Sequence, residues 1–511
     1  MNAVQRAFLH LGALAALCAA CPRAAAQLPP VQSPVVVGSG GAVGGGGRPG
    51  AGPAGITGGA LAERLEQDLS GSIPWPPHPD WGFLTTPEGA AWKFIGPSAG
   101  DPLLQLILPP GLSGNPTSPE VFNIQLPLKK LGNASPSAKP PGVIVGYHQF
   151  GVSQNAIHLG SFLPDFAAAY EMILIAPLGL SQINFGNPNS QASLQAVLGF
   201  VENYFPFDRD RIFGVGFSMG GLSAYANAIR RQDPADYRFA GIATHMGTVD
   251  PIAEYNLTSP EIKAVLENDV HFGTSPAADA YPWERALAGR GTSELVIDPD
   301  LAPIANLRDI RLHVSVNLND PVTLLLNQAL AMASHVGSQG WDTDLRIYSG
   351  PAEHSWMQFD LDRALRFLFT GGPAPIEPVS PGPIEIYADD VGVYRFTEVL
   401  EIEPSTLARY TISLGQDGSN SWTIPATRGI RRLAIDLDAL PSLSEDQPMT
   451  LSHFATDGVP FTLELRNFDQ APSLVLVNGL APLAWSYVAG NQTLRISPTD
   501  DGSFALIQVF P

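Results

Sequence analysis

Residues 216–221 read Gly-Phe-Ser-Met-Gly-Gly, which places a serine hydroxyl between glycines two positions away on either side. An apolar run precedes this segment, and a helix-forming stretch follows it. A serine on a sharp strand-to-helix turn can act as a nucleophile, and the small neighbours let adjacent backbone pass close by. The amino end of the following helix stabilises negative charge at the same place. We therefore interpret Ser218 as a catalytic nucleophile rather than an ordinary turn serine.

The elements that must position this serine form a regular alternation along the chain. The apolar, strand-like runs are Val143–Val145, Met172–Ala176, Ile212–Gly216, Ala240–Thr244, Leu312–Val316 and Leu345–Tyr348, with earlier strands expected at Leu103–Leu108 and Val121–Leu126. The helix-like stretches are Leu159–Tyr170, Ser190–Tyr204, Gly220–Arg231 and Val322–Val336, with a further short helix expected at Leu61–Gln67. Such alternation is typical of an α/β fold with a mostly parallel sheet covered by helices on both faces. Residues 251–308 interrupt the alternation and would form a cap over the carboxyl edge of the sheet.

The region around Ser218 resembles a known family. Residues 208–213, Asp-Arg-Asp-Arg-Ile-Phe, run into the serine motif in a way that is similar to the α/β-hydrolase group of esterase D, feruloyl esterases and polyhydroxybutyrate depolymerases. The sequence also resembles secreted prolyl-oligopeptidase-like hydrolases. The likeness covers roughly residues 121–369, about half of the chain. It implies the α/β-hydrolase fold, an activity without a cofactor, and a catalytic triad in the chain order serine, acid, histidine.

The resemblance also implies where the other two catalytic groups lie. A serine hydroxyl needs a base, and the base needs an acid that orients it. Asp320 follows the strand-like run that ends at Val316, and it resembles the acid of the family. His354 follows the last strand-like run, and it resembles the histidine. We expect His354 to be the base and Asp320 the acid.

Other aspartates and histidines compete for these roles. Asp250 stays open as the acid, because some hydrolases place the acid after the preceding strand. Asp342 and Asp344 precede the final strand and rank behind Asp320. His245 and His313 lie too early in the chain or inside a strand, so we expect packing or hydrogen-bonding roles for them.

The oxyanion of an acyl-transfer intermediate requires two aimed backbone donors. One should be the N–H of Met219, the residue after the nucleophile. The other should come from residues 147–151, Tyr-His-Gln-Phe-Gly, where the family usually has His-Gly and a small residue. Alignment with the family implies that Phe150 supplies the donor, and Gln149, which stands in the place of that glycine, is the alternative. His148 is expected to tether the loop.

Composition excludes several classes of function. The chain has 511 residues, 28 basic and 48 acidic, with a formal charge of −20. Proteins that bind nucleic acid use basic patches, so no nucleic-acid partner is expected, and stable membrane insertion is not expected either. The sequence has no His-Glu-x-x-His motif and its histidines are scattered, so we expect no metal site.

The N-terminus resembles a secretory signal peptide over residues 1–26, with a basic start, an apolar stretch and small residues at Ala24–Ala26. Cleavage there would remove Cys18 and Cys21, the only cysteines, and leave a secreted or periplasmic protein without disulfides. Lipid anchoring at Cys21 is the alternative. Residues 27–59 are rich in Gly and Pro and are expected to form a disordered linker.

The remaining chain divides into two expected units. Residues 60–372 would form the catalytic domain, and the Gly- and Pro-rich residues 373–383 a linker. Residues 384–511 have short strand-like runs separated by turn signals, which predicts an antiparallel β-sandwich-like accessory domain. The expected strands are Arg409–Leu414, Arg432–Leu437, Phe461–Leu465, Leu474–Val477, Thr493–Ile496 and Ala505–Val509.

Together these observations predict a secreted serine esterase that cleaves carboxylic esters through an acyl-enzyme. Its substrate would be an ester of a polysaccharide, a polyester or a lipid, and could be polymeric. A peptidase of the prolyl-oligopeptidase type is one alternative. A catalytically dead surface-binding protein is another, supported by Gln149 and the appended β-domain. The oligomeric state stays open.

Overall fold

The computed structural model describes a defined part of the chain. The described residues are 83–85, 89–127, 139–267, 303–370, 383–403, 407–414, 420–440, 444, 446–455, 460–480, 485–497 and 505–511. The expected signal peptide, the 27–59 linker and the helix at Leu61–Gln67 lie outside these residues. So do residues 268–302 of the expected cap and most of the 373–383 linker.

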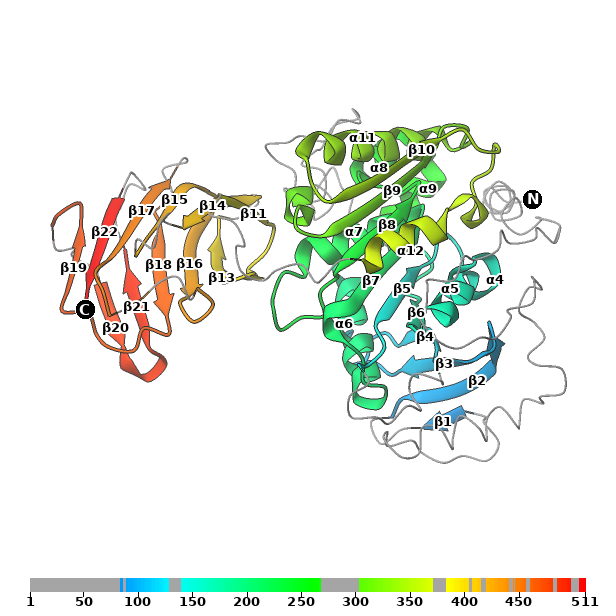
Figure 1. Cartoon of the computed structure of the whole chain (residues 1–511), viewed down its shortest axis with the longest axis horizontal. Helices are drawn as coiled ribbons and strands as arrows, with labels where there is room; N and C mark the ends of the chain where they lie inside the picture. The colour runs from blue at the N-terminus through cyan, green and yellow to red at the C-terminus, as the bar shows by residue number, and fades with distance from the viewer. Residues whose placement is uncertain are drawn as a thin grey trace.

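A ten-stranded sheet forms the first part of the structure, in the order β1-β2-β3-β4-β6-β5-β7-β8-β9-β10 (Figure 1). Its strands are β1 (Phe83–Thr85), β2 (Ala91–Ser98), β3 (Asp101–Leu108), β4 (Glu120–Gln125), β5 (Val143–Tyr147), β6 (Ile173–Pro177), β7 (Ile212–Phe217), β8 (Gly241–His245), β9 (Arg311–Asn317) and β10 (Thr343–Tyr348). Strands β1 to β4 pair antiparallel with their neighbours, and every pair from β6 to β10 is parallel. This is the α/β-hydrolase arrangement, as the sequence predicted.

Helices cover both faces of the sheet. The helices described in this part of the chain are α4 (Asn155–Gly160), α5 (Leu163–Ala169), α6 (Pro188–Tyr204), α7 (Met219–Arg230), α8 (Pro251–Leu257), α9 (Pro260–Val265), α11 (Thr323–Gln339) and α12 (Leu361–Phe369). The ring of Phe213 in β7 lies 4.8 Å from the ring of Phe369, at the end of α12. A Cβ on the next residue, Gly214, would instead contact Ala224 of α7. Because successive strand residues point to opposite faces, α12 and α7 cover opposite faces.

The helix expected at Leu159–Tyr170 is two short helices, α4 and α5, so that prediction was wrong in detail. Ser161 lies between them in an extended conformation. Its hydroxyl donates to the carbonyl of Ile157 and accepts the backbone N–H of Leu163, which closes one helix and opens the next. Pro164 has no backbone N–H to donate, so it is tolerated in the first turn of a helix but not in its interior. It therefore favours a helix that begins at Leu163 over one that continues from α4.

The second part of the structure contains two six-stranded sheets, ordered β11-β14-β15-β17-β22-β19 and β12-β13-β16-β18-β21-β20. Their strands are β11 (Ile384–Ala388), β12 (Gly392–Tyr394), β13 (Thr397–Ile402), β14 (Ala408–Leu414), β15 (Ser421–Arg428), β16 (Ile430–Asp436), β17 (Met449–Ala455), β18 (Thr462–Arg466), β19 (Leu474–Val477), β20 (Trp485–Val488), β21 (Thr493–Ile496) and β22 (Ala505–Phe510). Most pairs are antiparallel, as expected for a sandwich, but β15 with β17 and β16 with β18 are parallel. The expected strands are present, and β11, β12, β13, β15, β17 and β20 were missed.

The two parts have separate clusters of buried apolar side chains, and polar contacts join them. Asn306, in the 3-10 helix η3 (Pro303–Leu307), pairs with the backbone of Tyr387 in β11. Its side-chain oxygen accepts the Tyr387 N–H at 3.1 Å, and its amide donates to the Tyr387 carbonyl at 2.9 Å. Ion pairs of Arg230 with Asp389 and of Arg395 with Asp309 lie in the same contact.

Candidate active site

Ser218 lies on the sharp turn between β7, which ends at Phe217, and α7, which begins at Met219. Its backbone angles are φ 57° and ψ −127°, a conformation that L-residues rarely adopt and that is typical of a strained functional turn. A Cβ at Gly216 would collide with the carbonyl of Gly220. A Cβ at Gly220 would collide with the carbonyl of Tyr147 in β5. The glycines of the motif are therefore required by close backbone approach, as the sequence indicated.

His354 and Asp320 lie in direct contact. The Nδ1 atom of His354 is 2.9 Å from Oδ2 of Asp320, whose side chain is fully buried. The other carboxylate oxygen accepts the backbone N–H of Val322 at 2.8 Å. An ionised carboxylate only accepts hydrogen bonds, so Nδ1 is the nitrogen that donates to Asp320 and the basic lone pair of the neutral ring lies on Nε2. The ring of His354 lies 4.4 Å from the ring of Phe217, the residue before Ser218.

Two asparagines that the sequence reasoning missed join the acid loop to the histidine loop. Asn317, the last residue of β9, is fully buried and accepts the backbone N–H of Gly350 at 2.9 Å. Its amide donates to the carbonyl of Pro351 at 2.8 Å. Asn319 donates to the carbonyl of Gly350 at 2.7 Å. Two asparagines at the end of a strand-like run could have indicated these contacts, since asparagine side chains commonly bind nearby backbone in turns.

The carboxylates of Asp342 and Asp344 have other partners. Asp342 forms an ion pair with Arg311 at 2.9 Å. Asp344 binds Arg363 and lies 2.8 Å from Nδ1 of His313, so it makes a second Asp–His contact. Asp250 immediately precedes α8, and its backbone N–H donates to the side chain of Gln328 on α11 at 2.8 Å.

The two competing histidines are buried and packed, as expected. His245 is fully buried, and its Nδ1 is 3.1 Å from the hydroxyl of Ser315. Its ring stacks on Phe217 and Phe359, and burial lowers its pKa to about 3. Burial also lowers the pKa of His313, so both rings are neutral at pH 7.

The loop after β5 lies against the start of α7, beside Ser218, because a Cβ at Gly220 would contact the carbonyls of Tyr147 and His148. Met219 opens α7, where backbone N–H groups have no acceptor within the helix. The loop after β5 is anchored at several points: Nε2 of His148 is 2.9 Å from the carbonyl of Leu178, and the N–H of Gly151 donates to the carbonyl of Gln182. His148 therefore tethers the loop, as the sequence suggested. The Phe150 ring packs edge-on against Phe185 at 5.8 Å.

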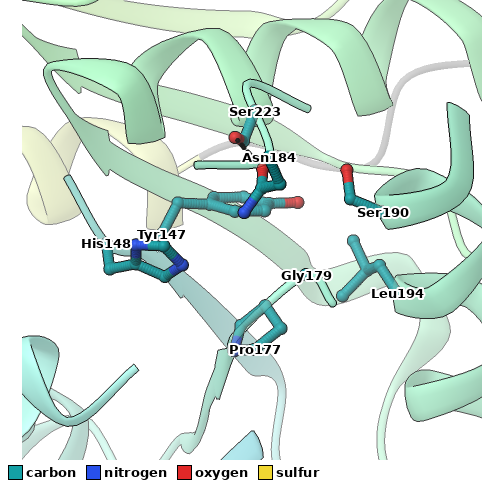
Figure 2. A pocket seen from close by; sticks show the side chains of 8 residues that line it. All are labelled: Tyr147, His148, Pro177, Gly179, Asn184, Ser190, Leu194 and Ser223. Atoms are coloured by element: carbon teal, nitrogen blue, oxygen red, sulfur yellow. Dashed lines mark hydrogen bonds between the residues drawn. The ribbon is translucent and has the colours of Figure 1, made fainter. Parts of the chain in front are cut away.

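A small pocket adjoins the start of this loop (Figure 2). It is lined by Tyr147, His148, Pro177, Gly179, Asn184, Ser190, Leu194 and Ser223. The hydroxyl of Ser223 donates to the side chain of Asn184 at 3.2 Å, and the amide of Asn184 donates to the carbonyl of Leu178 at 3.0 Å. Ser218, Asp320 and His354 do not line it, so this pocket is not the candidate active site.

Glu254, which lies on α8, makes the free energy of unfolding depend on pH. Burial raises its pKa from 4.5 to about 7, and the nearby Asp250 carboxylate acts in the same direction. The folded protein therefore keeps a proton that the unfolded chain releases, and stability falls as the pH rises from about 4.5 to 7.

Glu254→Gln should remove this penalty, because the amide is neutral at every pH. We expect the variant to exceed the wild type in free energy of unfolding by about 1–2 kcal/mol at pH 8, and the difference to shrink towards zero near pH 4.5. Urea denaturation of both proteins at the two pH values measures this. An equal difference at both would show that Glu254 does not titrate as described.

Within the described parts of the chain, no helix is both long and apolar enough to cross a membrane. The same residues contain no group of three or more metal-ligating side chains.

No family model and no curated protein matches this sequence. Solved structures do resemble it. FphF, a fluorophosphonate-binding serine hydrolase from Staphylococcus aureus, is 16% identical over 53% of this chain and 99% of that chain, with a TM-score of 0.39. A ferulic acid esterase is 16% identical over 52% and 96%, with a TM-score of 0.37. An acetyl xylan esterase from Paenibacillus sp. R4 is 15% identical over 61% and 93%, with a TM-score of 0.35. At these identities and TM-scores the resemblance to the three enzymes is distant.

Proposed function

We propose that the protein is a serine hydrolase that cleaves carboxylic esters through Ser218, His354 and Asp320. The observation that carries the proposal is the 2.9 Å contact of His354 with the buried Asp320, next to a strained serine turn. An aspartate on Nδ1 fixes the tautomer that a general base needs, and it stabilises the imidazolium that forms.

In the proposed reaction, Oγ of Ser218 attacks the ester carbonyl carbon while Nε2 of His354 takes the hydroxyl proton. The negative charge moves to the carbonyl oxygen, where the N–H of Met219 and that of Phe150, or alternatively Gln149, stabilise it. The intermediate collapses, and His354 returns the proton to the leaving alcohol. Water then attacks the acyl-enzyme with His354 again as base, which releases the acid and regenerates Ser218.

The proposed substrate is an external ester, in a polysaccharide, a polyester or a lipid. The signal-peptide-like N-terminus supports this, because export would bring the enzyme to such material outside the cytoplasm.

Substrate class can be tested by comparing turnover of p-nitrophenyl esters of graded acyl length with turnover of peptide p-nitroanilides. We expect the purified chain to hydrolyse the esters and to leave the anilides intact. Faster cleavage of prolyl anilides would instead favour the hypothesis that the protein is a peptidase of the prolyl-oligopeptidase type. Turnover of neither would favour a surface-binding protein.

A further inference from the structure

Gln149, which replaces the glycine of the resembling family, makes a contact that a glycine cannot make. The indole N–H of Trp356 donates to Oε1 of Gln149 at 3.0 Å, although the two residues are 207 positions apart. Trp356 is buried, and a buried donor without an acceptor costs about 1–3 kcal/mol. The hydrogen bond therefore joins the loop after β5 to the histidine loop with a defined geometry.

Trp356 is itself part of the packing around His354. It lies two residues after His354 and opens the 3-10 helix η4 (Trp356–Gln358). Its ring is 5.6 Å from that of Phe217, which packs against His354, and 6.0 Å from that of Phe359. The indole is thus held by its neighbours, so its N–H offers Gln149 a fixed donor.

The loop has a different set of anchors on its other side. His148 and Gly151 bind carbonyls of the segment that follows β6, at Leu178 and Gln182. Gln149 ties the residues between them to the histidine loop. This span contains both candidate donors for the oxyanion, so displacement of the Gln149 side chain would move them.

We propose that Gln149 is a positioning residue: its hydrogen bond to Trp356 holds the loop at 148–151 so that a backbone N–H aims at the developing oxyanion. The proposal rests on the function proposed above. A misplaced donor weakens stabilisation of the transition state more than binding of the substrate, because the charge develops only in the transition state. The loss should therefore appear in kcat and leave KM nearly unchanged.

The test uses the full chain with two single variants and their double variant. Gln149→Leu removes the acceptor, and Trp356→Phe removes the donor and keeps an aromatic ring. We expect Gln149→Leu and Trp356→Phe each to lower kcat by about 10–100-fold, with KM within about threefold of wild type. The Gln149→Leu/Trp356→Phe double variant should lose no more than the worse single variant, because both break one contact.

Circular dichroism and melting temperature show whether each variant is folded. If Gln149→Leu keeps kcat within threefold of wild type, or if the two losses multiply in the double variant, the proposal is overturned. A rise in KM with unchanged kcat would also overturn it. An inactive wild type would refute the proposed function itself, whereas an active wild type with fully active variants would refute only the role of Gln149.

Discussion

Ser218→Ala is expected to lower ester turnover by at least about 10⁴-fold while the protein stays folded. Alanine lacks the hydroxyl that attacks the carbonyl, yet it accepts the same backbone strain as serine at φ 57°. The melting temperature should therefore change little. Kinetics with a soluble ester, together with a thermal melt, measures both effects.

Ser218→Gly provides a matched control for the strained turn. Glycine adopts this conformation without the penalty of a Cβ, so this variant should be as inactive as Ser218→Ala but at least as stable. Activity within tenfold of wild type in either variant would reject Ser218 as the nucleophile.

Asp320→Asn is the second change with a large expected effect. The carboxylate accepts from Nδ1 of His354, and an amide in its place favours the tautomer with the proton on the wrong nitrogen. Losses of about 10⁴-fold in kcat accompany this change in a triad protease, and we expect a loss of that order here. The fold should be kept, because the side-chain volume is nearly unchanged and an oxygen can still accept from Val322.

Asp344→Asn is the matched control, because Asp344 lies 2.8 Å from Nδ1 of His313 in a contact of the same geometry. It belongs to β10, and its His313 contact does not involve Ser218, so this change should affect stability and leave kcat within about threefold. Asp250→Asn should likewise spare kcat. If Asp250→Asn were inactive and Asp320→Asn active, the catalytic acid would be Asp250, which follows the preceding strand.

Local patterns were sufficient to predict strands β3 to β10 of the hydrolase sheet, and they missed β1 and β2. Its central strands are buried on both faces, so they read as continuous apolar runs, and the motif glycines mark the turn at Ser218 because backbone passes close there. The order of Ser218, Asp320 and His354 came from a family resemblance. The structure brings Asp320 and His354 together, and the catalytic roles of all three residues remain a proposal.

The missed features depend on contacts between distant segments. Nothing near Gln149 in the sequence indicates that Trp356 will donate to it, because the pairing exists only when the two loops meet. Strand β12 has three residues and β20 four, too short for a periodic pattern to stand out. The break at Ser161 depends on its hydroxyl binding both flanking helices, which competes with an otherwise continuous helical pattern.

The most direct test of the central claim is to treat the purified protein with a fluorophosphonate probe and to locate the adduct by peptide mass spectrometry. We expect one phosphonylated residue, Ser218, with labelling absent in Ser218→Ala and strongly slowed in His354→Ala. An unlabelled wild-type protein, or an adduct that persists in Ser218→Ala, would contradict the assignment of Ser218 as the nucleophile.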